Sequence, residues 1–146
     1  MKYQHPVMAL IATCVFTLVI AACGGGGSSA RVSPTDVTGL WRGTTQDSIG
    51  GAGQLFYSIT QQGAKLSGNW GVTYPNPILD NAGTVFGNIS GATVQMTFAP
   101  ASPDPCMTFA TGTLNAAANQ TSGTYNRGTC PNQQSGTFVV DKQSGP

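Results

Sequence analysis

The sequence predicts an all-β protein: a single antiparallel, eight-stranded up-and-down β-barrel that follows a cleaved signal peptide and a flexible tether. From residue 37 onward there is no helical apolar stripe of about ten residues; short runs rich in Thr, Val, Phe, Tyr and Trp are separated by Gly, Asn and Pro. The chain has 146 residues, of which 8% are charged, and a formal net charge of +1. This length suits one domain, and the charge gives no electrostatic footprint for nucleic acid.

Residues 1–22 are predicted to be a signal peptide. Lys2 is followed by an apolar run, 7–22, that is shorter than the roughly 20 residues of a membrane-spanning helix. The run ends in Val19-Ile20-Ala21-Ala22-Cys23, which resembles the lipobox of bacterial lipoproteins. The resemblance implies cleavage before Cys23, acylation of Cys23 and a lipid membrane as partner. An uncleaved anchor and plain secretion are the alternatives.

Residues 23–36 are predicted to be the lipidated cysteine and a Gly/Ser-rich tether. Such a tether spans roughly 20 Å on average, so the domain of residues 37–146 is expected close to a membrane of the bacterial cell envelope. Gly24 stands where an Asp is the familiar signal for retention in the inner membrane. The outer membrane is therefore favoured.

Eight strands are expected in the remaining domain. Residues 93–98 alternate most cleanly, with Val94, Met96 and Phe98 on one face and polar side chains on the other, as in an antiparallel sheet with one buried face. The predicted strands are 38–45, 54–61, 64–73, 83–89, 92–99, 106–114, 122–127 and 135–141.

The hairpin registers follow from the turns. Two-residue turns at Gln62-Gly63 and Ser90-Gly91 place Ile59 opposite Leu66 and Ile89 opposite Ala92, with the apolar side chains of each hairpin on one face. If the loop 115–121 is symmetric about its middle residue, the flanking strands pair so that Phe109 lies opposite Arg127; we call this centring the loop.

The same centring places Cys106 opposite Cys130, which predicts a disulfide on the outside of the barrel, clamping one hairpin. A metal pair is the alternative, but the exported part of the chain has no His or Glu to complete a metal site. No metal and no cofactor are expected.

A short motif places a glycine two residues before an aromatic side chain, on the same face of a strand. A ring over a strand glycine is typical of strongly curved sheets and barrels, although a β-sandwich remains an alternative. The motif occurs at Gly39 with Trp41, Gly68 with Trp70, Gly123 with Tyr125 and Gly136 with Phe138.

Gly39-Leu40-Trp41 in the first strand, followed by a meander of some eight strands, resembles the lipocalin and avidin-like barrels. The resemblance implies an architecture in which Trp41 closes one barrel end and a ligand is bound inside. Lipocalins have an Arg near the last strand at that end, and here Lys142 is the nearest cation. Small bacterial inhibitors of lysozyme and of secreted proteases share the architecture.

The residues available for catalysis are few. The single histidine, His5, lies in the predicted signal peptide, so nucleophile systems that need His are excluded from the exported chain. All five acidic residues are aspartates, and Asp80 and Asp104 lie in predicted loops where such residues are usually solvated or cap turns. We therefore expect a protein that is not an enzyme.

Two functions remain open for a monomeric barrel. The first is an envelope component or inhibitor-like protein that binds a macromolecular partner through loops 74–82 and 100–105 or through the outward rings of Phe56 and Phe86.

The second is a lipocalin-like binder of a small apolar ligand, which a cavity of about 300 Å³ or more would favour. Arg127 is expected near the barrel mouth, meeting an anionic group or lying over the rim. In a barrel of this size the inward side chains line a ligand or fill the core. These candidate lining residues are Leu55, Tyr57, Ile59, Trp70, Val85, Met96, Phe98, Phe109 and Tyr125.

Overall fold

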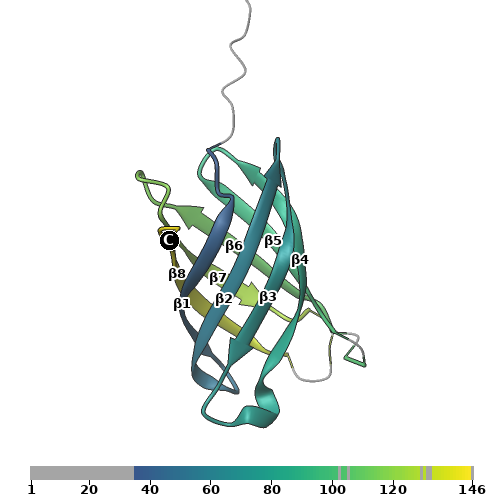
Figure 1. The fold of residues 1–146 in the computed structure, drawn as a ribbon. Helices are drawn as coiled ribbons and strands as arrows, with labels where there is room; N and C mark the ends of the chain where they lie inside the picture. Colours follow the sequence, from purple (N-terminus) through teal and green to yellow (C-terminus); the bar gives the residue numbers. More distant parts are fainter. Residues whose placement is uncertain (1–34, 102, 105, 129, 131–132, 146) are drawn as a thin grey trace, which may run out of the picture. The chain divides into compact units, whose positions relative to one another are not determined.

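The computed structural model describes residues 35–101, 103–104, 106–128, 130 and 133–145. Eight antiparallel strands form a closed barrel in chain order, with β8 pairing back onto β1 (Figure 1). The predicted fold class is confirmed, and the closure rules out a two-sheet sandwich. The predicted signal peptide, the predicted lipidation site Cys23 and nearly all of the predicted tether lie outside the described residues. No helix within the described part of the chain is long and apolar enough to cross a membrane.

All eight predicted strands are present, with ends shifted by a few residues. A short 3-10 helix, η1, lies between the third and fourth strands. The elements are β1 (Gly39–Asp47), β2 (Gly51–Gln62), β3 (Lys65–Thr73), η1 (Pro77–Leu79), β4 (Asn81–Ser90), β5 (Thr93–Pro100), β6 (Thr108–Leu114), β7 (Gln120–Asn126) and β8 (Ser135–Lys142).

The up-and-down order gives the barrel two different ends. The connections β1–β2, β3–β4, β5–β6 and β7–β8 lie at one end, which we call the open end (Figure 1). The three remaining hairpins lie at the other end, together with Val37 before β1 and the last residues of β8. We call this second end the closed end.

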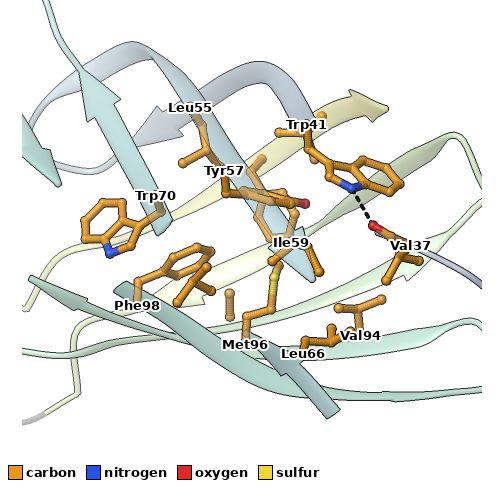
Figure 2. Close-up of a cluster of buried hydrophobic side chains, with 14 of the residues drawn as sticks. Val37, Trp41, Leu55, Tyr57, Ile59, Leu66, Trp70, Val94, Met96 and Phe98 are labelled. Atoms are coloured by element: carbon orange, nitrogen blue, oxygen red, sulfur yellow. Dashed lines mark hydrogen bonds between the residues drawn. The ribbon is translucent and has the colours of Figure 1, made fainter. Parts of the chain in front are cut away.

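Alternating side chains separate the core from the surface. In β2, Leu55, Tyr57 and Ile59 are buried whereas Phe56 points outward, as expected for a strand with one buried and one solvent-exposed face. The buried rings contact one another along the barrel, and Trp70 meets Phe98 edge to face with centroids 5.2 Å apart (Figure 2). This arrangement lies within the range that aromatic pairs prefer.

Trp41 closes one end of the barrel, as the lipocalin resemblance implies. Its side chain is buried, and its indole Nε1–H donates to the carbonyl oxygen of Val37 at 2.9 Å (Figure 2). Val37 is itself buried, and its N–H donates to Gln61 Oε1 at 2.8 Å. Lys142, which pairs with Trp41 across β1 and β8, donates from Nζ to the carbonyl oxygen of Asp36 at 3.1 Å. The segment before β1 is thus fixed over the closed end.

The predicted registers of two hairpins are wrong by two residues. Ile59 pairs with Gly68 and not with Leu66, and Ile89 pairs with Val94 and not with Ala92. The turns are Gly63-Ala64 and Gly91-Ala92, in which each glycine has a positive φ (61° and 58°). A type II′ turn requires glycine at its first central position, which the prediction had placed second. A shift of two leaves every side chain on its predicted face.

The predicted register of β6 with β7 is wrong by one residue, which changes the face of β6. Phe109 pairs with Asn126, and its side chain points outward with 49% of its surface exposed, whereas Ala110 is buried. The side chain of Asn115 accepts hydrogen bonds from the N–H groups of Asn119 and Gln120 at 3.0 and 3.2 Å. These bonds close the loop one residue earlier than centring predicts. Phe109 therefore does not line the barrel interior.

Candidate functional site

A cavity of about 60 Å³ lies inside the open end of the barrel. It is several times the space that one water molecule needs but smaller than the about 300 Å³ typical of a drug-sized ligand site. The barrel interior is otherwise filled by side chains. The cavity is lined by Thr45, Asp47, Leu55, Trp70, Val72, Tyr74, Leu79, Asn81, Phe98, Thr108, Tyr125, Arg127, Gln134 and Phe138.

The predicted lining residues separate into groups. Leu55, Trp70, Phe98 and Tyr125 line the cavity at the open end. Three others, Tyr57, Ile59 and Met96, surround a void of only about 10 Å³ at the closed end. Val85 is buried in the core and lines neither space, and Phe109 lies outside the barrel. The sequence therefore predicted part of the apolar wall of the cavity, without Val72, Leu79 and Phe138, and also included residues that only fill the core.

Tyr125 and Asp47 form the polar side of the cavity. The Tyr125 hydroxyl donates to Asp47 Oδ2 at 2.6 Å, and Thr45 Oγ1 lies 3.1 Å from the same hydroxyl. The Tyr125 ring passes over Gly136, where an added Cβ would lie 2.7 Å from the ring carbon Cζ. Gly136 is thus the reason that this tyrosine can reach across β8 to β1.

The carboxylate of Asp47 is held in its charged form by neutral donors. Burial by itself would raise the pKa of Asp47, but hydrogen bonds from the Gly50 N–H, the Tyr125 hydroxyl, the Ile49 N–H and the Gln134 amide outweigh it and lower that pKa below its usual value. Burial, reinforced by donation to Asp47, raises the pKa of Tyr125 well above its usual value. At neutral pH the pair is therefore a carboxylate and a neutral phenol.

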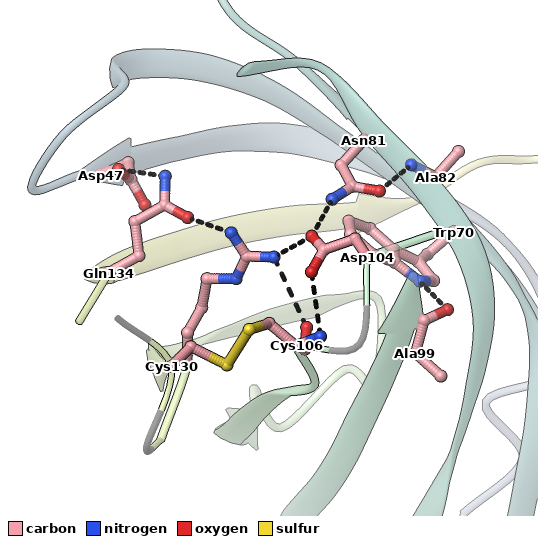
Figure 3. A network of polar contacts seen from close by, with 10 residues as sticks. Asp47, Trp70, Asn81, Ala82, Ala99, Asp104, Cys106, Cys130 and Gln134 are labelled. Atoms are coloured by element: carbon pink, nitrogen blue, oxygen red, sulfur yellow. Dashed lines mark hydrogen bonds and ion pairs between the residues drawn. A yellow bond between two sulfur atoms is a disulfide. The ribbon is translucent and has the colours of Figure 1, made fainter. Parts of the chain in front are cut away.

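Arg127 lies near the barrel mouth, as predicted from its strand position, but its charge is already engaged by an ion pair. Its guanidinium forms an ion pair with Asp104 and donates from Nη1 to Gln134 Oε1 at 2.9 Å. Gln134 in turn donates to Asp47 Oδ1 at 3.1 Å, and Asn81 donates to Asp104 at 3.3 Å (Figure 3). A hydrogen-bonded chain thus runs around one side of the mouth.

Cys106 and Cys130 form the predicted disulfide, with Cα atoms 5.8 Å apart (Figure 3). They are not a direct cross-strand pair, because β6 begins at Thr108 and β7 ends at Asn126. The bridge instead joins the β5–β6 and β7–β8 connections, which contain Asp104 and Gln134. It therefore holds together the two connections that contribute Asp104 and Gln134 to the hydrogen-bonded chain at the mouth.

Tyr74 forms another part of the mouth. Its ring lies over Gly50 and Gly53, where an added Cβ would come within 2.8 and 2.7 Å of ring carbons. Its N–H donates to Asp80 Oδ1 at 2.7 Å, so Asp80 caps the loop as its sequence context indicates. The loop continues into η1, where Ile78 is 87% exposed. Loop 74–82 and the described residues of 100–105, both expected as contact segments, thus lie at the open end.

The described residues contain no group of three His, Cys, Asp or Glu side chains that could hold a metal ion. The polar groups of the cavity are instead an aspartate, a neutral phenol, amides and an ion-paired guanidinium. Such groups can orient a ligand by hydrogen bonds and charge.

Sequence reasoning missed the polar cavity residues Thr45, Asp47, Thr108 and Gln134, and the apolar residues Val72 and Phe138. Thr45 and Asp47 have the same strand parity as Trp41, so the alternation of β1 was a usable signal for two inward polar side chains. Gln134 lies just before β8 in a connection, where no such periodicity exists.

No protein-family model matches the chain, and no curated protein matches its sequence. Two solved β-barrel structures are similar to it. One is titled EF1p2_mFAP2b bound to DFHBI, with a TM-score of 0.62, 12% identity, and coverage of 73% of this chain and 93% of that one. The other, a redesigned β-barrel named mFAP1 bound to DFHBI, has a TM-score of 0.60, 13% identity and coverage of 72% and 94%. At these identities the likeness shows the fold alone.

Proposed function

We propose that this protein is a non-enzymatic barrel that binds a small, mostly apolar molecule, or one end of a longer one, at its open end. The observation that carries the proposal is the cavity itself, with Trp70 and Phe98 on one side and the Tyr125–Asp47 pair on the other. A concave, largely apolar space with a few oriented polar groups is typical of small-molecule sites.

The size of the cavity limits the ligand. A cavity of about 60 Å³ that opens at the mouth accepts a fragment such as a single ring, and the rest of a longer molecule would project through the mouth. Trp41 and Tyr57 stack with centroids 6.2 Å apart and close the barrel beyond the cavity, so a ligand cannot pass deeper. The two similar barrels are both bound to the small molecule DFHBI, which supports this function by analogy of fold.

We further propose that Cys23 anchors the barrel by a lipid, with the bacterial envelope, and the outer membrane in particular, as its location. The lipobox-like segment before Cys23 supports this proposal. The chain enters the barrel at the closed end, through Val37.

Two measurements test ligand binding. Native mass spectrometry of the protein purified from its own host should show an added mass that denaturation removes. In NMR titrations, the uncharged ring compound p-cresol should shift the indole N–H of Trp70 and leave that of Trp41 unchanged, because Trp41 lies at the closed end. The absence of both an added mass and a shift of Trp70 would reject the function.

A macromolecular partner is the second candidate function. On the outer face, Phe86 of β4 and Phe109 of β6 both pair with Thr97 of β5, and the two rings are 46% and 49% exposed. Neighbouring outward rings often mark contact sites. Phe56, in contrast, packs across Gly71, where a Cβ would lie 2.3 Å from its ring.

A photo-crosslinking amino acid at position 97 tests this second candidate in membranes of the native host. We expect a discrete protein adduct that disappears in the double variant Phe86→Ser, Phe109→Ser. Position 44, which points outward on β1, is the matched control and should give no such adduct. Adducts of equal yield at both positions, or none at either, would count against the partner.

A further inference from the structure

The cavity at the open end combines aromatic walls with a buried carboxylate that no cation neutralises. Trp70, Phe98, Tyr74 and Tyr125 all contribute to its lining. Asp47 also lines it and is only 4% exposed. Within the described ranges of the chain, the one ion pair joins Arg127 to Asp104, so Asp47 has no cationic partner there. Buried charges in proteins are usually paired, so a buried carboxylate without a cationic partner indicates a place where a positively charged group can bind.

The charges around the mouth are unequal. Asp47, Asp80 and Asp104 lie at the open end, and Arg127 is the positive side chain beside them. Because Arg127 is engaged by Asp104, the carboxylates of Asp47 and Asp80 remain uncompensated. This excess of negative charge disfavours an anionic ligand and favours a cationic one.

The hydrogen bonds of Asp47 restrict the kind of cation further. Its Oδ1 accepts from the N–H groups of Ile49 and Gly50 at 2.8 and 2.7 Å and from Gln134, and its Oδ2 accepts from Tyr125. The carboxylate acts on a ligand mainly through its charge, since its oxygens already have four donors. A quaternary ammonium group suits such a site, because it has no N–H to satisfy and is attracted to the faces of aromatic rings.

We infer that the ligand of this cavity carries an organic cation of the quaternary ammonium type, held against the aromatic rings and facing Asp47. This inference rests on the proposed ligand-binding function and adds the charge of the ligand to it.

The test compares choline with its uncharged isostere 3,3-dimethyl-1-butanol by NMR titration of the full chain carrying Cys23→Ala. We expect choline to shift the Trp70 indole N–H, leave that of Trp41 in place, and bind roughly tenfold more tightly than the isostere. The Asp47→Asn variant should reduce this preference at least about threefold. Asp141→Asn removes the same charge on β8 at the closed end and should keep the preference.

Should Asp47→Asn not fold, Asp80→Asn removes the other uncompensated charge of the open end and should also lower the preference for choline, by less than Asp47→Asn because Asp80 does not line the cavity. Asp80 is exposed, and its hydrogen bond from the Tyr74 N–H can be kept by an amide oxygen, so this variant is expected to fold. Equal binding of choline and the isostere, both sensed by Trp70, would overturn the inference and leave ligand binding supported. No shift of Trp70 with choline would also overturn it, and the proposed function would then be judged by the mass spectrometry and p-cresol results.

Discussion

Tyr125 donates its hydroxyl hydrogen to Asp47 at 2.6 Å, across 78 positions of sequence. The bond connects the end of β7 to the end of β1, with β8 lying between them in the barrel. It is possible because Gly136 of β8 leaves room for the tyrosine ring. This hydrogen bond thus links β7 to β1 across β8 at the mouth of the cavity.

Asp47 should make the barrel acid-sensitive. Its pKa is lowered in the folded state, so its contribution to the free energy of unfolding is complete above the unfolded pKa of about 3.9 and is lost as the pH falls through the folded pKa. Asp47→Asn should therefore cost about 1–3 kcal/mol at pH 7, and the gap to wild type should narrow below about pH 4 in urea titrations followed by circular dichroism. Asp141→Asn, with an exposed side chain, is the control and should stay within about 0.5 kcal/mol of wild type. A pH-independent gap would contradict this assignment.

Removing the Cys106–Cys130 bridge should destabilise the protein without unfolding it at room temperature. The residues are 24 positions apart, and closing a loop of about this length contributes roughly 3 kcal/mol in the chain-entropy model. The double variant Cys106→Ala, Cys130→Ala should show this loss in urea unfolding, and adding a reductant should have no further effect on it. The Cys23→Ala variant, which retains Cys106 and Cys130, should contain no free thiol at these two positions under oxidising conditions. Two reactive thiols there would contradict the pairing.

The indole hydrogen bonds of the two tryptophans should differ in their contribution to stability. Trp41→Phe leaves the carbonyl of Val37 without its buried donor at 2.9 Å and should cost about 1–3 kcal/mol beyond the effect of the smaller ring. Trp70→Phe is the matched control, since its Nε1 lies 3.4 Å from the Ala99 oxygen and this bond is weaker. Urea midpoints measure both losses, and a larger loss at Trp70 would show that the Val37 bond is not what secures the closed end.

Cys23 should be the site of lipid attachment. Metabolic labelling with a fatty-acid analogue should mark the wild-type protein, and Cys23→Ala should abolish the label and release the barrel from membranes. Cys14→Ala, another cysteine of the N-terminal segment, should keep the label. Labelling that persists after Cys23→Ala would exclude the lipobox interpretation.

The sequence was sufficient for the barrel and for its long strands because alternation is strong in them. In β2, Leu55, Tyr57 and Ile59 fix which face is inward even when the register with β3 is misjudged by two residues. β6 has no such contrast: Phe109 and Ala110 are adjacent apolar residues, and either could face the core. The side-chain bonds of Asn115, which loop length alone does not predict, decide between them.

The candidate site was predictable only where it lies on strands. Trp70 and Phe98 were expected inside the barrel from their parity, and they form part of the apolar wall of the cavity. Gln134 and Asp104 come from connections whose path depends on the disulfide and on Arg127. Gln134 and Asp104 lie near each other because of the tertiary structure, and the local periodicity of the sequence does not predict such a contact.

The pairing of β1 with β8 has a consequence for how the chain is made. Trp41 meets Lys142, nearly the whole domain later in sequence, so the barrel cannot close until residues 135–142 have been synthesised. Until then both β1 and β7 are edge strands with unpaired backbone groups, which invite association with other chains. Such long-range pairing also slows folding. Correct folding therefore requires that β8 pairs with β1 and β7 before a strand of another molecule pairs with these edges.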